Sequence, residues 1–213
     1  MNAATSRSET DTLPRADSRQ KEETRRSLQT RLPQLPLAPT TRQKISTLLA
    51  HPTLSHLVEF DVAVNSTSFI YMMDHMDAAA YLIRHFDLGD FEVHPTGQNT
   101  FAVDDREGAK AIIQRLYATS RQRILWGEGT YDSALLPVIR GQALLVVDLL
   151  PRGEERVQTR VTSYVQIHNK FLGFLIKVVT TLVPGIIDRK LERAFGVVTK
   201  LERAIHKDPV QAY

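Results

Sequence analysis

The segment YMMDHMD, residues 71–77, holds the densest group of side chains that could bind a metal or move a proton. Asp74 and Asp77 are three residues apart, so both carboxylates would lie on one face of a helix. His75 would lie about 100° from Asp74 around the helix axis, away from that face. A metal centre needs its ligands to converge. We therefore expect no metal site here and interpret the segment as a solvated helix face, with acid–base chemistry as the alternative.

Four other polar residues could act on a bound molecule: His94, Tyr131, Arg140 and Asp148. Arg140 and Asp148 lie in or beside apolar sequence, where an unpaired charge is costly. We expect them to pair with each other; the alternative is that Arg140 meets an anionic ligand. His94 and His168 are expected at the surface. The chain has no G-x-S-x-G, P-loop or G-x-G-x-x-G motif, so binding is favoured over catalysis and no cofactor is expected.

Composition excludes several classes of protein. The 213 residues, 42% of them hydrophobic, suffice for one buried domain and a tail. Cysteine is absent, which excludes disulfides, thiolate zinc sites and a cysteine nucleophile. Residues 1–44 carry nine basic and five acidic side chains, and residues 170–208 carry eight basic and four acidic side chains. Because the net charge of the whole chain is +3, residues 45–169 must have a net negative charge. This pattern suits weak attraction to an anionic membrane surface, and the acidic middle argues against nucleic acid.

The first 40 residues predict a disordered tail, because they contain no aromatic residue and no glycine and bury too little apolar surface. They also lack the apolar core of a signal peptide, so a cytoplasmic protein is expected, with peripheral membrane association as an addition. A single domain is expected over residues 41–208, with a frayed end at 209–213. Oligomeric state is not readable from the sequence.

Helical periodicity predicts three helices before the C-terminal region. Residues 40–51 form a short one, capped by Thr40 or Thr41, and residues 105–122 form another, capped by Asp105. Between them, residues 65–86 carry an apolar stripe at helical spacing, with Ser66 or Ser68 as the cap. The stripe consists of Phe69, Met73, Met76, Ala80 and Ile83. Its methionines suit either core packing, which we favour, or an adaptable apolar pocket.

Strands are predicted from alternation and apolar runs. The segment VEFDVAV, residues 58–64, alternates cleanly, and residues 157–168 do so again. Residues 91–105 read as two short strands around a turn. Residues 123–132 have strand character, and the glycines in GEG indicate a bulge or a close approach to the backbone. Residues 141–151 are almost continuously apolar, which predicts a strand buried on both faces.

The last predicted element is a long helix from Asn169 to Ile205. Its first half has an apolar arc of about 200°, and Pro184 predicts a kink before an ordinary amphipathic second half. The apolar run is too short and too interrupted to span a bilayer, which needs about 20 apolar residues. A core helix is favoured, and a helix lying on a membrane surface is the alternative.

This order of elements resembles the START-like superfamily, also called SRPBCC or helix-grip proteins. The resemblance covers residues 55–206 and lies in the strand VEFDVAV, the helical segment 66–86, the late hairpin GQALLVVDLL…VQTRVTSYVQI and the terminal helix. The predicted helix 105–122 and the kink at Pro184 depart from the family pattern. The resemblance implies an α+β fold in which a curved antiparallel sheet grips the long C-terminal helix around an apolar cavity. It also implies binding of lipids, isoprenoids, polyketides or similar ligands.

The leading hypothesis is therefore binding or transfer of a hydrophobic small molecule or lipid between the sheet and the C-terminal helix. The alternatives are a cyclase or hydratase acting on an apolar substrate, and a peripheral membrane adaptor. The predicted ligand-binding residues are Phe69, Met73, Met76, Trp126, Tyr131, Arg140, Phe171, Phe174, Leu175, Val178 and Leu182.

Overall fold

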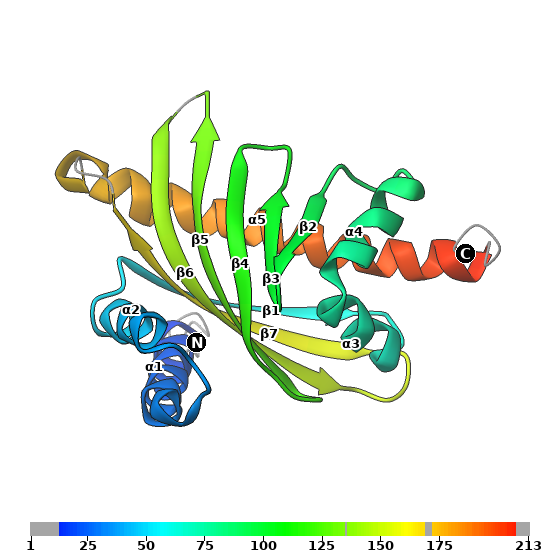
Figure 1. The fold of residues 1–213 in the computed structure, drawn as a ribbon, viewed down its shortest axis with the longest axis horizontal. Coiled ribbons are helices and arrows are strands. Elements are labelled where there is room, and N and C mark those ends of the chain that lie inside the picture. Colours follow the sequence, from blue (N-terminus) through cyan, green and yellow to red (C-terminus); the bar gives the residue numbers. More distant parts are fainter. Residues whose placement is uncertain (1–12, 135, 169–171, 208–213) are drawn as a thin grey trace, which may run out of the picture.

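The computed structural model describes residues 13–134, 136–168 and 172–207 and contains one seven-stranded antiparallel sheet with helices on both faces (Figure 1). The strand order is β1-β7-β6-β5-β4-β3-β2. The strands are β1 (Leu54–Val62), β2 (Glu92–Gly97), β3 (Thr100–Asp104), β4 (Ala109–Ala118), β5 (Gln122–Ser133), β6 (Leu136–Pro151) and β7 (Val157–Ile167). The helices are α1 (Leu13–Arg31), the short 3-10 helix η2 (Leu32–Gln34), α2 (Pro39–Ala50), α3 (Ser66–Asp74), α4 (Met76–His85) and α5 (Leu172–Lys207).

Two separate hydrophobic cores pack against opposite faces of the sheet. On the face toward α5, here called the inner face, Val147, Leu149 and Val161 pack with Phe195 and Leu201 of α5. On the face toward α1 and α2, here called the outer face, other sheet residues pack under these two helices. They are Ile124, Trp126, Leu144, Val146 and Tyr164. Burial on both faces explains the continuous apolar run of β6, which confirms that prediction.

The predicted helix over residues 105–122 is wrong, because this segment forms a turn followed by β4. Asp105 accepts hydrogen bonds from the backbone N–H groups of Glu107 and Ala109, and Gly108 adopts a φ of 101°, so the chain reverses instead of entering a helix. A bulge between Arg115 and Tyr117 shifts the strand alternation. The apolar spacing then imitates a helical period. Because this segment is a strand and not a helix, one of the two departures from the helix-grip pattern disappears.

The N-terminal region also differs from the expected disordered tail. Of residues 1–40, those before 13 lie outside the described part, whereas residues 13–34 are helical and α2 begins at Pro39. Leu28, Leu32 and Leu35 are buried against the outer face, which provides the apolar burial that we judged to be missing. Helix α2 has Ala38 as its N-cap and Pro39 in the first turn, instead of a threonine cap.

The helical segment 65–86 is divided in two at His75, which takes a non-helical conformation with φ −120° and ψ 61°. Asn65, not a serine, caps α3 by accepting from the N–H groups of Thr67 and Ser68. The strands predicted over residues 91–105 are confirmed as the β2–β3 hairpin. Helix α5 continues across Pro184, so the proline does not end it. The side chains of residues 172–184 are outside the described part.

A partly buried ion-pair network around Arg123 connects the α3–α4 junction to the sheet. Asp74 binds Arg123 through both carboxylate oxygens, at 2.9 Å to Nε and to Nη2, and also accepts from Arg115 at 2.9 Å. The side chain of Arg123 is only 2% exposed. Asp74 is therefore a structural counterion instead of the solvated carboxylate that we expected.

Replacing Asp74 should destabilise the protein strongly, because Arg123 would retain a buried charge without its main partner. We expect Asp74→Asn to lower the free energy of unfolding by about 3 kcal/mol, measured by urea denaturation. Glu92→Gln, which breaks the exposed pair with Arg106, is the matched control and should change it little. Equal losses in the two variants would contradict this role of Asp74.

Tyr164 connects the sheet to α1 through a buried hydroxyl. The side chain is 1% exposed, and its hydroxyl donates to the backbone carbonyl of Lys21 at 2.6 Å. Burial raises the pKa of Tyr164 above its ordinary value of 10.0. The unfolded chain therefore releases this proton at a lower pH than the folded protein does, and the resulting stability is lost as the pH rises above 10.

We expect the free energy of unfolding to fall above pH 10, by up to about 1.4 kcal/mol per pH unit from this group. Tyr164→Phe should remove that part of the pH dependence while costing about 1 kcal/mol at neutral pH through the lost hydrogen bond. Denaturation at pH 7 to 11 measures both effects. An unchanged alkaline slope in the variant would show that Tyr164 is not responsible.

Candidate ligand cavity

A cavity of about 480 Å³ lies between the inner face of the sheet and α5. Its described wall is mostly apolar, with five strands on one side and a short part of α5 on the other. The apolar lining consists of Phe91, Val103, Ala109, Ala111, Ile113, Leu125, Gly127, Gly129, Ile139, Gly141, Ala143, Leu145, Val165, Ile167, Leu191 and Ala194. This volume is within the range of small-molecule sites, about 300–1,000 Å³.

The floor of the cavity is a patch of very small residues on neighbouring strands. Strand pairing aligns Ala111 with Gly129 and Gly129 with Gly141, and the next inner-face row aligns Gly127 with Ala143. Paired residues share a face of the sheet. Because these positions contribute almost no side-chain volume, the space between the backbone and α5 stays open.

Two of these glycines also allow close packing of the backbone. A Cβ atom on Gly129 would lie 2.3 Å from the carbonyl oxygen of Lys110, and one on Gly141 would lie 2.6 Å from that of Gln166. Gly127 differs, because its Cβ would meet only Ile113 and Ile112 at ordinary contact distances of 3.8 and 3.9 Å. Gly127 can therefore carry a side chain that extends toward the cavity.

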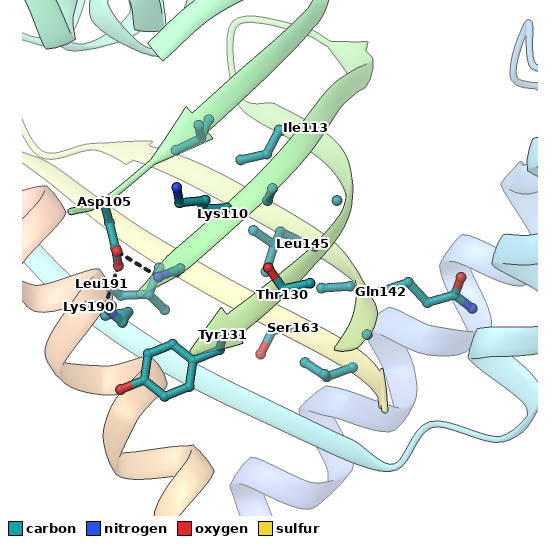
Figure 2. Close-up of a pocket in the computed structure, with 18 of the residues that line it drawn as sticks. Asp105, Lys110, Ile113, Thr130, Tyr131, Gln142, Leu145, Ser163, Lys190 and Leu191 are labelled. Atoms are coloured by element: carbon teal, nitrogen blue, oxygen red, sulfur yellow. Dashed lines mark hydrogen bonds and ion pairs between the residues drawn. The ribbon is translucent and has the colours of Figure 1, made fainter. Parts of the chain in front are cut away.

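One end of the cavity is polar (Figure 2). There Lys190 of α5 forms an ion pair with Asp105 and another, at 3.5 Å, with Glu107. Its ammonium also lies 5.4 Å from the ring centre of Tyr131. Arg193, one helical turn further along α5, pairs with Glu107. The turn between β3 and β4 is thus attached to α5 by charges at this end.

Three of the four remaining polar residues of the lining have partners within the protein, and the fourth, Thr130, alternates along β5 with the inner-face residues Gly129 and Tyr131. Ser163 donates to the carbonyl of His56, and the Gln142 amide donates to Gln166 at 2.6 Å. Lys110 pairs with Asp104 at 3.2 Å. The polar character of the described wall is therefore concentrated at the Asp105–Lys190 end.

Of the predicted ligand-binding residues, Tyr131 lines this cavity. Phe69 is fully buried in the inner core with α5, and Met73 packs against the same core. Met76 begins α4 and is half-buried. None of these last three is in the described lining.

Trp126 lies on the outer face, where α1 and α2 cover it, because it alternates with Leu125 and Gly127 of the cavity wall. Its indole N–H donates to Glu128 at 3.0 Å, and the ammonium of Lys44, hydrogen-bonded to Glu128, lowers the pKa of that carboxyl. Arg140 is exposed on the same strand row as Thr130.

Arg140 does not form the predicted pair with Asp148. The two are eight residues apart on one strand, which corresponds to about 26 Å at roughly 3.3 Å per residue. Asp148 accepts instead from Gln122 at 2.7 Å. The remaining predicted wall residues are Phe171, Phe174, Leu175, Val178 and Leu182, and their side chains lie outside the described part of α5.

The residues that form the cavity but were not predicted are mainly Gly127, Gly129, Gly141, Ala143 and the Asp105–Lys190 pair. A signal for the floor exists in the sequence: GEG and GQA each place two small residues at strand spacing, hence on one face. The ion pair joins residues 85 positions apart, and no local pattern marks it.

The segment 71–77 does not form a metal site among the residues that the structure describes. Asp74 is bound by arginines, the ring of His75 lies 4.3 Å from that of Tyr71, and Asp77 lies in the first turn of α4, where the helix dipole favours a carboxylate. Within the described ranges, no helix has the length and apolar character needed to cross a bilayer.

Comparison with known proteins identifies the fold. No protein-family model and no curated protein matches the sequence. Among solved structures, a conserved protein from Geobacillus kaustophilus aligns with a TM-score of 0.55 and 15% identity, over 71% of this chain and 97% of that one. A START superfamily protein from Mycobacterium smegmatis gives 0.49 and 10%, over 71% and 98%. Norcoclaurine synthase from Thalictrum flavum gives 0.43 and 12%, over 70% and 86%.

The sheet order, the C-terminal helix and the alignment with the Geobacillus kaustophilus protein together confirm the predicted α+β fold, in which an antiparallel sheet grips a long C-terminal helix. At this level of identity the similarity concerns the fold alone. The share of this chain outside the alignments is comparable in size to the segment before β1, which includes α1 and α2.

The glycines of the cavity floor should differ in their tolerance to substitution. Gly129→Ala should lower the free energy of unfolding by about 1–3 kcal/mol, because its methyl group would collide with the backbone of β4. Gly127→Ala, two residues away on the same face, should cost less than about 1 kcal/mol. Chemical denaturation of both variants provides the measurement, and a reversed order would contradict the described floor.

Proposed function

We propose that this protein binds a hydrophobic small molecule or lipid in the cavity between the sheet and α5. The observation that carries the proposal is the floor of glycine and alanine under about 480 Å³ of space with an otherwise apolar wall. Larger side chains at Gly127 or Ala143 would be enough to fill much of this space. An unfilled apolar void costs contact energy, so a ligand that fills it would be stabilising.

Catalysis has less support than binding. Of the four polar candidates, only Tyr131 lines the cavity. His94 and Arg140 are exposed, and Asp148 is paired at the outer face. Within the described lining, a cyclase or hydratase would act through Tyr131 and the neighbouring Lys190 and Asp105, which already neutralise each other.

A membrane adaptor is also less favoured, because the second half of α5 directs its apolar side chains into the core. Phe195, Val197 and Leu201 are at most 8% exposed. A helix lying on a membrane surface needs that face for lipid. Flotation with anionic vesicles at low salt tests this alternative directly, and strong binding without a bound small molecule would favour it.

Ligand retention provides the direct test of binding. Native mass spectrometry of the purified protein should show a reproducible mass increment, and organic extraction should recover the same molecule. The neutral fluorophore N-phenyl-1-naphthylamine serves as a probe, since its emission rises when it enters an apolar site. Absence of both an increment and probe binding would overturn the proposal.

Filling part of the cavity should weaken binding without changing the fold. Ala143→Leu adds three carbons to the floor and should weaken N-phenyl-1-naphthylamine binding by about tenfold or more. Ala102→Leu is the matched control, because Ala102 shares an outer-face row with Ile112 and Glu128. The control should bind as the wild type does; equal weakening in both would place the probe elsewhere.

A further inference from the structure

Building on the proposed function, we infer that the ligand is an uncharged amphiphile whose neutral polar oxygen, such as a hydroxyl or carbonyl, meets the Asp105–Lys190 pair. The apolar part of the ligand would then lie on the glycine floor, and the oxygen at the polar end of the cavity. The inference depends on the charge balance, the burial and the hydrogen-bond capacity of this pair.

The charges around the polar end are already balanced. Asp105 and Glu107 contribute two carboxylates, Lys190 and Arg193 contribute two cations, and each is in an ion pair with a member of this group. Lys110, the other charged residue of the described lining, pairs with Asp104. Among the described lining residues, a ligand therefore has no charge to neutralise.

The four charges form an inner and an outer pair. The side chains of Asp105 and Lys190 are 12% and 27% exposed, whereas those of Glu107 and Arg193 are 48% and 39% exposed. A ligand in the cavity meets the inner pair first, where water compensates a charge least. A carboxylate or ammonium at this position would have to compete for one partner and leave the other charge without compensation.

A neutral oxygen can bind without breaking the inner pair. Asp105 directs Oδ1 to the backbone N–H groups of Glu107 and Ala109 and Oδ2 to Lys190. The Lys190 ammonium has three N–H donors. Among the described residues it contacts the carboxylates of Asp105 and Glu107, so one donor remains for an acceptor on the ligand.

The experiment compares three probes that have the same alkyl chain but different polar end groups: dodecan-1-ol, dodecanoate and dodecylamine. Each displaces N-phenyl-1-naphthylamine from the full-length protein at pH 7, where the acid and the amine are charged. The wild type should bind dodecan-1-ol about tenfold more tightly than either ion. Equal affinities, or preference for an ion, would overturn the inference while leaving apolar binding intact; failure of all three to bind would remove the proposed function itself.

Charge substitutions should change the preferred end group in opposite directions. Asp105→Asn keeps an Oδ1 atom that can accept the hydrogen bonds of the turn, but it leaves an excess positive charge. The affinity for dodecanoate should therefore rise about tenfold relative to that for dodecan-1-ol. Lys190→Gln leaves excess negative charge, so dodecylamine should gain instead. The double variant restores neutrality and should again prefer the alcohol.

Lys44→Gln is the control, because it removes a cation that pairs with Glu128 at the outer face. It should preserve the wild-type order of the three probes. If the Asp105 and Lys190 variants also preserve that order, or if Lys44→Gln alters it equally, the pair does not select the end group and the inference fails.

Discussion

Helix α5 can pack closely against the sheet only where the inner face carries large side chains. Toward the Val157 end of β7, Val147, Leu149 and Val161 meet Phe195 and Leu201 of the helix in a continuous core. Toward the other end β5 and β6 present Gly127, Gly129, Gly141 and Ala143, and the helix remains separated from the backbone by the cavity. This change of side-chain size along the inner face thus divides a single interface into a supporting core and a cavity.

Packing on the outer face of the sheet compensates for the stability that the small residues of the inner face lose. Glycine in strands costs backbone entropy and loses side-chain packing. The same central strands compensate on their other side, where Trp126, Leu144, Val146 and Tyr164 are buried under α1 and α2. The N-terminal helices are therefore part of the domain that holds the cavity, and Tyr164 ties α1 to the sheet through a hydrogen bond to Lys21.

The fold was largely predictable because the strands that carry it show regular patterns. Strands β1 and β7 alternate, β6 is apolar on both faces, and a long helix ends the chain. Strand β4 is not predicted because its bulge shifts the alternation, and α1 is not predicted because its buried Leu28 stands among many charges. The cavity was harder to predict. The sequence interpretation assigns the wall to large residues such as Phe69 and Trp126, but large side chains fill space, and a cavity is left where residues are small.

The polar end of the cavity follows from the same geometry. The turn after β3 reaches α5 where the core borders the cavity, and Asp105 and Glu107 attach the turn there through Lys190 and Arg193. Ion pairs at this place serve two purposes that apolar contacts could not combine. They connect sheet and helix across the open region, and under the proposed function they would offer polar atoms to a ligand without leaving a net charge in an apolar space. The attachment that completes the fold is therefore also the feature that would select a neutral ligand.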